Sequence, residues 1–368
     1  MDSARRRVLV SWGAALVLAV GVRAEAQQYK QTNLVSDLSG AMTMDTNLVN
    51  PWGLTRSSTS PWWVADNGTG LSTLYNGNTG AIVPLVVTIP PAAGGTSGVP
   101  TGTVFNGTSD FKLPNGNPAR FLFVGEDGTI SGWNGGAMAV LKSTDPDAVY
   151  KGAAIATRKG VNYLYVANFR KHRIDVFDTA FHRVRWDDDD SGEESESHGR
   201  PFRDERVPRS FAPFNVQNIG GSLYVAFAKV DSEGHDEVQG AGLGFVDVFS
   251  PGGRLLRRFQ HGPWLNAPWG LALAPNDFGA FSHNLLVGQF GSGEIAVYDV
   301  ASGRFLGKLQ NDMGGVLSID GLWALGFGNG ATAGPVNTLF FTAGIQDESH
   351  GLFGTLTPVA AAPFGSGQ

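Results

Sequence analysis

Short apolar runs, rich in β-branched and aromatic residues, alternate with polar turns along most of the chain. In one typical stretch the run Tyr165–Asn168 ends at a polar turn, and a second run, Arg173–Phe177, follows four residues later. Runs of this length and composition predict β-strands joined as hairpins. Six copies of the paired pattern follow one another at intervals of about 45–60 residues, which is the spacing of four-stranded propeller blades. The first runs of the six copies start at Trp63, Phe123, Tyr165, Tyr224, Leu286 and Phe340.

A shorter apolar run precedes each copy, and we interpret it as the innermost strand of a blade. The runs that contain a Trp are Asn50–Leu54, Ala267–Leu271 and Gly321–Leu325. The run Ala212–Val216 has Phe214 at the same place. The two remaining copies, near Thr101 and Ala153, are degenerate and lack the aromatic residue.

The two ends of the repeat predict how the ring closes. The sixth copy ends near Pro358 without an outer strand, whereas Gln31–Ser36 is a spare strand ahead of the first copy. A ring closed by this N-terminal strand has no exposed sheet edge at the junction. The sequence therefore predicts an all-β fold, a six-bladed β-propeller closed by an N-terminal strand. A β-sandwich is the structural alternative, and six copies of one pattern argue against it.

Composition agrees with many tight turns and excludes some chemistry. The chain has 51 Gly and no Cys, so disulfides, thiolate metal sites and Cys nucleophiles are excluded. The formal net charge is −6, and the stretch 187–196 alone contains seven acidic residues and no basic one. No basic face is predicted, so we do not expect nucleic acid as a partner.

The first 26 residues have the features of a signal peptide. Arg5–Arg7 are followed by the apolar run Val8–Val22 and by small residues at Ala24 and Ala26. This predicts cleavage before Gln27 and export to the periplasm or the extracellular space, by the general or the twin-arginine route, with no membrane span afterwards. A membrane anchor is the alternative, but a span needs about 20 apolar residues.

The remaining chain is predicted to be one propeller domain, residues 27–359. Residues 187–208 are acidic and poor in apolar residues, which predicts a flexible insertion. The small, polar tail 360–368 is predicted to be disordered.

Four longer segments resemble a family of uncharacterised exported bacterial proteins. They are Asn47–Leu54, Asn266–Pro275, Ile319–Leu325 and Glu348–Gly354. The stretch 165–178 is also similar to the NHL-type propeller repeat. The resemblance implies a six-bladed propeller and export, and it supplies no catalytic residues.

Propeller topology indicates which face should carry function. Loops that join second to third strands share a face with loops that join one blade to the next, and in this chain those loops are long and polar. They include residues 66–70, 168–172, 231–240 and 346–350. Binding groups concentrate on loops that a rigid scaffold holds, so we expect the functional face here.

Polar residues at the ends of second strands are the first candidate site. Asp66, Glu126, Asn168 and Gln289 occupy positions that line up between copies and are expected to ring the mouth of the channel. Propellers of the lactonase type hold a divalent metal near such a place, and the metal activates water. The alternative is that these side chains cap turns, as Asp and Asn often do.

The loop 231–237 is the densest cluster of possible metal ligands. It offers Asp231, Glu233, His235, Asp236 and Glu237. Carboxylate oxygens suit a divalent cation such as Ca²⁺, and a His would admit a transition metal. The alternative is a solvated acidic loop, because the spacing is not that of an EF-hand.

The aromatic residues of the innermost strands are a third candidate. Trp52, Trp269 and Trp323, together with Phe214, would form a platform for a sugar or another flat ligand, or they pack between blades.

Three functions remain open at this point. The first is a binding or interaction propeller for a protein, a glycan or a small molecule. The second is a metal-dependent, lactonase-like hydrolase or lyase with its site in the central channel. The third is a structural component, which a channel filled by apolar side chains would favour.

Overall fold

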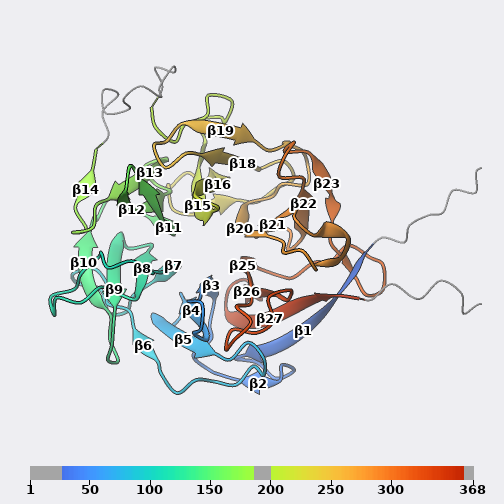
Figure 1. Cartoon of the computed structure of the whole chain (residues 1–368), viewed down its shortest axis with the longest axis horizontal. Coiled ribbons are helices and arrows are strands. Elements are labelled where there is room, and N and C mark those ends of the chain that lie inside the picture. Colours follow the sequence, from blue (N-terminus) through green and yellow to red (C-terminus); the bar gives the residue numbers. More distant parts are fainter. Residues whose placement is uncertain (1–26, 186–199, 360–368) are drawn as a thin grey trace, which may run out of the picture.

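The computed structural model describes residues 27–185 and 200–359. The predicted signal peptide 1–26, the predicted tail 360–368 and most of the predicted insertion 187–208 lie outside these residues. The described chain forms six sheets arranged as blades around one axis, and their strands are antiparallel except where β2 and β24 pair with β1 (Figure 1). The prediction of an all-β, six-bladed propeller is confirmed, and the sandwich alternative is excluded.

The first three blades contain four strands each, numbered from the innermost outward. Blade 1 consists of β3 (Pro51–Thr55), β4 (Trp62–Asp66), β5 (Leu71–Tyr75) and β6 (Val87–Thr88). Blade 2 consists of β7 (Pro100–Phe105), β8 (Phe121–Gly125), β9 (Thr129–Trp133) and β10 (Val140–Thr144). Blade 3 consists of β11 (Tyr150–Arg158), β12 (Val161–Asn168), β13 (Arg173–Phe177) and β14 (Arg183–Val184).

Blade 5 follows the same plan, whereas blades 4 and 6 carry additional short strands. Blade 4 consists of β15 (Phe211–Ile219), β16 (Ser222–Val230), β18 (Gly244–Phe249) and β19 (Leu255–Arg258), with β17 (Glu237–Val238) paired to β16. Blade 5 consists of β20 (Pro268–Leu273), β21 (Leu285–Gln289), β22 (Ile295–Tyr298) and β23 (Phe305–Lys308). Blade 6 consists of β25 (Leu322–Phe327), β26 (Leu339–Ile345), β27 (His350–Pro358) and β1 (Gln28–Ser36), with β2 (Thr43–Met44) and β24 (Gln310–Asn311) on its outer edge.

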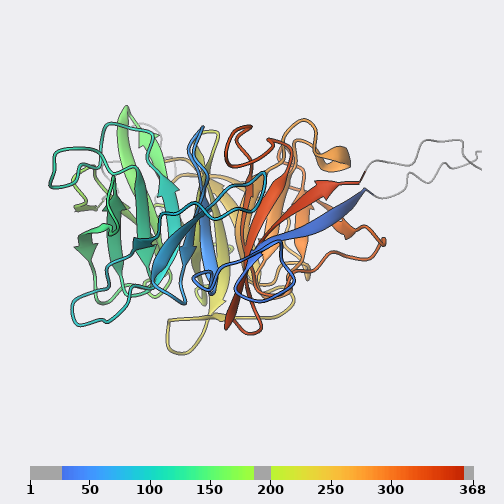
Figure 2. The ribbon, with the colours of Figure 1, turned by 90° about the horizontal axis from the view of Figure 1, so that it is seen from below.

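The N-terminal strand closes the ring, as the sequence predicted. β1 pairs antiparallel with β27 from Tyr29 opposite Pro358 to Ser36 opposite Leu352, and the two strands lie side by side in Figure 2. Tyr29, Leu34 and Val35 of β1 are buried. The last blade is therefore built from both ends of the propeller.

Part of the predicted flexible insertion is packed instead. Phe202 and Val207 are buried in a cluster with Tyr165 and Phe249, between blades 3 and 4. Asp204 accepts a hydrogen bond of 2.9 Å from Nη2 of Arg258 on β19. Two apolar residues suffice to pack residues 200–208 against the blades, and the flexibility of the insertion stays a prediction.

The innermost strands approach one another closely around the axis. A Cβ at Gly53 would lie 2.4 Å from the carbonyl oxygen of Thr101, and a Cβ at Gly270 would lie 2.6 Å from the carbonyl oxygen of Trp323. Only glycine fits such contacts. A cavity of about 20 Å³, lined by all six innermost strands, is left on the axis. It is large enough for about one water molecule, so the channel is closed in the middle.

No helix among the described residues is both long and apolar enough to cross a membrane.

Candidate functional site

Every innermost strand has a β-bulge near its start, and the residue in the bulge faces the axis. The register shifts between Pro51 and Leu54 in β3 and between Pro268 and Leu271 in β20, and corresponding shifts occur in the other four strands. Bulges re-aim side chains and are frequent beside functional sites. The six residues placed in this way are Trp52, Thr101, Lys151, Phe214, Trp269 and Trp323.

Four of these residues form an aromatic hub, defined as Trp52, Phe214, Trp269 and Trp323. The rings of Trp52 and Trp323 stack with centroids 3.5 Å apart, and Trp269 stands edge-on to both. All four side chains are buried. The Trp residues thus fill the channel rather than form an open platform, which agrees with the packing alternative.

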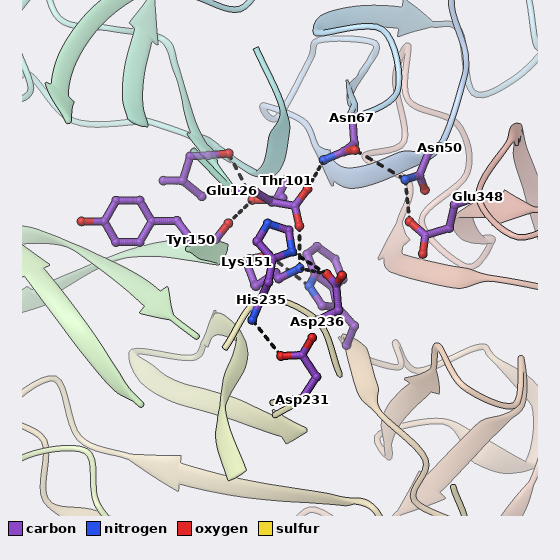
Figure 3. Close-up of polar contacts among 12 residues, drawn as sticks. Asn50, Asn67, Thr101, Glu126, Tyr150, Lys151, Asp231, His235, Asp236 and Glu348 are labelled. Carbon is purple, nitrogen blue, oxygen red and sulfur yellow. Dashed lines mark hydrogen bonds and ion pairs between the residues drawn. The ribbon is translucent and has the colours of Figure 1, made fainter. Parts of the chain in front are cut away.

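Lys151 occupies the hub position of blade 3, although its side chain carries a charge. The side chain is fully buried, and its Nζ lies 2.5 Å from Oε1 of Glu126 and 3.2 Å from Oδ1 of Asp236 (Figure 3). The same Nζ lies 4.9 Å from the ring centroid of Trp52 and 5.8 Å from that of Phe169, within cation–π distance. One ammonium group therefore sits between an aromatic floor and two carboxylates.

Electrostatics keep this ammonium charged. Burial alone would lower the pKa of Lys151, but the charges of Glu126, Asp236 and Glu237 overcome that effect, and the pKa is raised. Burial would likewise raise the pKa of Asp236, but Lys151 and His235 bring it below its usual value. Lys151 is thus an internal counter-ion and not a neutral base or nucleophile.

The carboxyl groups around Lys151 outnumber its single positive charge. Burial and the neighbouring carboxylates of Glu348 and Asp236 raise the pKa of Glu237 to about 7, despite Lys151. Burial, Glu126 and Asp236 likewise raise the pKa of Glu348. We call Glu126, Asp236, Glu237 and Glu348 together with Lys151 the acidic mouth.

Two asparagines hold the carboxylates of the mouth in place. Asn67 donates a hydrogen bond of 2.8 Å from Nδ2 to Oε2 of Glu126, and Asn50 donates one of 2.6 Å from Nδ2 to Oε2 of Glu348 (Figure 3). Glu348 is the third of three consecutive residues with positive φ, at 55°, 52° and 62°. Such strained backbone persists where the surroundings impose it, and it is frequent at functional sites.

The second-strand residues predicted to ring the mouth divide into two groups. Glu126 faces Lys151, but Asp66 is buried within blade 1, where its Oδ2 accepts hydrogen bonds from N and Oγ1 of Thr73 at 3.0 and 2.8 Å. Asn168 donates to Asp175 within blade 3, and Gln289 accepts from the backbone N–H of Asn266. These three side chains are therefore bound within their own blades, and Asn168 also caps its turn, because its Oδ1 accepts a hydrogen bond of 3.2 Å from the backbone N–H of Lys171.

The cause of that error is a shift of one residue. Asp66, Asn168 and Gln289 each pair with the first residue of an innermost strand, and in blade 2 that pairing belongs to Gly125 and not to Glu126. Neighbouring residues of a strand point to opposite sides, so the shift reverses the side chain. The positions equivalent to Glu126 are Asn67, Phe169 and Phe290.

The predicted metal ligands of the loop 231–237 do not converge as a set. Oδ1 of Asp231 accepts hydrogen bonds from the backbone N–H groups of Glu233 and His235, and the side chain of Glu233 is exposed. His235 and Asp236 instead meet Glu126, and single ligand atoms of these three residues lie within 4.8 Å of one another. Lys151 already holds Glu126 and Asp236, so a metal would have to displace its ammonium.

The sequence contained one signal for Lys151. Tyr150-Lys151-Gly152 lines up with Pro51-Trp52-Gly53, with Lys in place of Trp. His350, beside Glu348 in sequence, points elsewhere, because its Nδ1 lies 2.6 Å from Oδ2 of Asp37.

Comparison with known proteins gives relatives without an assigned activity. The uncharacterized protein R648 of Acanthamoeba polyphaga mimivirus is 30% identical over 357 residues, which cover 93% of this chain and 83% of the relative. The chain belongs to the family of this protein. The uncharacterized protein L690 of the same virus is 31% identical over 91% of this chain and 87% of its own length. These relatives are viral, so the resemblance to exported bacterial proteins stays a prediction. No family model matches the chain.

Solved structures agree on the fold alone. A glucose dehydrogenase has a TM-score of 0.53 at 13% identity, covering 90% of this chain and all of the other. A Bacteroides thetaiotaomicron protein of unknown function has a TM-score of 0.53 at 11% identity, over 91% of this chain and 77% of the other. Streptogramin B lyase has a TM-score of 0.50 at 11% identity, over 90% of this chain and 98% of the other. Propellers of one shape thus serve different chemistry, and fold alone assigns none.

Proposed function

We propose that this protein is an exported binding propeller that takes a cationic group of its ligand, an ammonium or guanidinium, at the acidic mouth. The observation that carries the proposal is the excess of carboxyl groups there. Lys151 pairs with Glu126 and Asp236, whereas Glu237 and Glu348 make no ion pair within residues 27–185 and 200–359. A bound cation would favour the charged form of both groups, whose pKa is raised by burial first and by the neighbouring carboxylates second.

The mouth already holds one organic cation, which belongs to the chain itself. The ammonium of Lys151 lies 4.9 Å from the Trp52 ring centroid and contacts the carboxylates of Glu126 and Asp236. Because Trp52 is buried, a ligand cation would be held by the carboxyl groups of the mouth. A filled channel would by itself suit a structural component of the envelope. However, the half-buried carboxyl groups of Glu237 and Glu348 destabilise the fold when no cation pairs with them. A purely structural role would not explain why these groups are present. Export follows from the sequence features of residues 1–26.

A cation such as agmatine, which carries an ammonium and a guanidinium, is expected to bind and to release protons. Near pH 7 about half of the Glu237 side chains are protonated, and a bound cation lowers the pKa of that group. Up to roughly half a proton per ligand should leave, and affinity should rise by up to about tenfold between pH 6 and pH 8. Calorimetric titration in buffers of different ionisation enthalpy measures this release.

The control for this titration lies in the same loop. Glu237→Gln should weaken binding and remove its pH dependence, whereas Glu233→Gln changes an exposed residue outside the mouth and should leave both intact. Agmatine that fails to bind, or that binds equally to Glu237→Gln and the unaltered protein, would refute the proposal.

The alternative function, a metal-dependent hydrolase or lyase, has one observation in its favour. Glu126, His235 and Asp236 offer a mixed oxygen and nitrogen ligand set in one place. A metal held there would activate water or polarise a carbonyl of a lactone. Against it stands Lys151, whose ammonium contacts two of the three ligands.

Elemental analysis of protein purified without chelator separates the two functions. Because the ammonium of Lys151 already contacts two of the three ligands, we expect less than one divalent ion per chain and the same melting temperature with and without EDTA. The opposite result is one tightly bound ion per chain. If EDTA or the substitution Glu126→Gln removes this ion and lowers the melting temperature by several degrees, the enzyme is favoured instead.

A further inference from the structure

A second polar site lies away from the axis, between blades 3 and 4. A cavity of about 900 Å³ is bounded by β13, by β14 and by the segment 200–209 that leads into β15. Its volume falls in the range of sites that bind a drug-sized or oligosaccharide ligand. The buried side chains of Phe202 and Val207 are part of its lining.

The walls of this cavity are strongly basic. Among the residues that the structure describes, two acidic ones, Asp175 and Asp204, line it together with eight basic side chains. The basic residues are Lys171, His172, Arg173, Arg183, Arg185, Arg200, Arg203 and Arg209. The expectation that no face is basic was therefore wrong at this place, because it rested on the acidic balance of the whole chain.

Four arginines of this cavity are not neutralised by a neighbour within residues 27–185 and 200–359. Arg173 pairs with Asp175 at 2.6 Å, Arg183 with Asp145 at 3.0 Å and Lys171 with Asp147 at 3.5 Å. Among the residues that the structure describes, the remaining arginines make no ion pair. These are Arg185, Arg200, Arg203 and Arg209, and all four are exposed.

We propose that this arginine groove binds an anionic oligosaccharide through its sulfate or carboxylate groups. Guanidinium groups form paired, charge-assisted hydrogen bonds with such oxyanions, which gives arginine an advantage over lysine. Single-stranded nucleic acid fits less well, because base stacking needs an exposed aromatic face. The rings of Phe202 and Phe227 in this cavity are only 6% and 4% exposed, and the half-buried ring of Phe211 packs edge-on against Phe245 with centroids 4.9 Å apart.

The test uses the full mature chain and three labelled probes: a sulfated heparin octasaccharide, an unsulfated hyaluronan octasaccharide and a short oligothymidylate. The sugar probes separate sulfate from carboxylate recognition. We expect at least one sugar probe to bind more tightly than the oligothymidylate, with an affinity that falls as salt rises. The variant Arg185→Gln/Arg200→Gln/Arg203→Gln/Arg209→Gln should lose about tenfold or more in affinity, with a shallower salt dependence.

A matched control removes the same charge elsewhere. Lys30→Gln/Lys112→Gln/Arg120→Gln/Arg304→Gln changes four exposed residues of blades 2, 5 and 6 and should retain binding within about twofold. Equal losses in both variants, or tighter binding of the oligothymidylate, would overturn the proposal. A further variant changes the seven acidic residues of 187–196 to Asn and Gln. If the sugar probes bind only to this variant, the proposal is overturned, and the acidic segment itself is the occupant of the groove.

Discussion

Replacing Lys151 with Met is expected to lower the free energy of unfolding by about 3–5 kcal/mol. The substitution keeps most of the side-chain volume on the aromatic hub but removes the charge that Glu126 and Asp236 face at 2.5 and 3.2 Å. Two carboxylates then lie close together without a cation. Chemical denaturation, followed by Trp fluorescence, measures the loss, because three of the nine Trp residues are in the hub.

Two further variants show whether charge or packing is responsible. Lys171→Met removes an exposed lysine whose partner Asp147 is 3.5 Å away, and it should cost less than about 1 kcal/mol. Lys151→Met/Glu126→Gln removes one of the stranded carboxylates and should regain much of the loss. A single variant Lys151→Met that unfolds like the unaltered protein would mean that the mouth does not depend on its internal cation.

Removing β1 is expected to abolish cooperative folding of the propeller. A chain that begins at Asp37 lacks the strand that pairs with β27 along its length, and it loses the buried side chains of Tyr29, Leu34 and Val35. At about 1.5–3 kcal/mol for each buried side chain, the loss is comparable with the whole stability of a typical domain. It also exposes β27 as a sheet edge, which favours aggregation.

Size-exclusion chromatography and thermal melting check this result against a chain that begins at Gln27. A synthetic peptide of residues 27–36, added in trans, should restore monomeric, cooperatively melting protein by pairing with β27 in place of β1. A truncated chain that remains monomeric and melts normally without the peptide would contradict closure by β1 as the source of stability.

The fold was predictable because it rests on a local pattern that recurs. Each blade repeats the same short strands and polar turns, so even degenerate copies, such as the one near Thr101, could be placed by their neighbours. The ring closure followed from counting, since one strand was spare at the start and one was missing at the end. The sequence therefore shows that the N-terminal strand replaces the missing outer strand of the last blade. It does not show the register in which β1 pairs with β27.

The site was predictable only in part because its members come from different blades. Lys151 and Asp236 are 85 residues apart, and Asn50 and Glu348 are 298 apart. No local pattern records such contacts. Glu126 and the loop 231–237 were noticed for their chemistry, whereas the roles of Asp66, Asn168 and Gln289 depended on a register that one residue reverses. Lys151 was hidden at a position where four of the other five blades have an aromatic residue.

The pairing of β1 with β27, which closes the ring, also determines how the molecule responds to mechanical force. Gln28 and Val359 are joined by a backbone hydrogen bond, and the side chain of Gln27 donates to the carbonyl oxygen of Val359. Both strands of the closure therefore leave the ring from the same end. Tension applied through the two ends loads the hydrogen bonds between β1 and β27 one after another, as in opening a zipper, rather than all together. We therefore expect thermal unfolding to be cooperative, with all blades lost together. A comparatively small force that pulls on the two ends should, in contrast, separate β1 from β27 first.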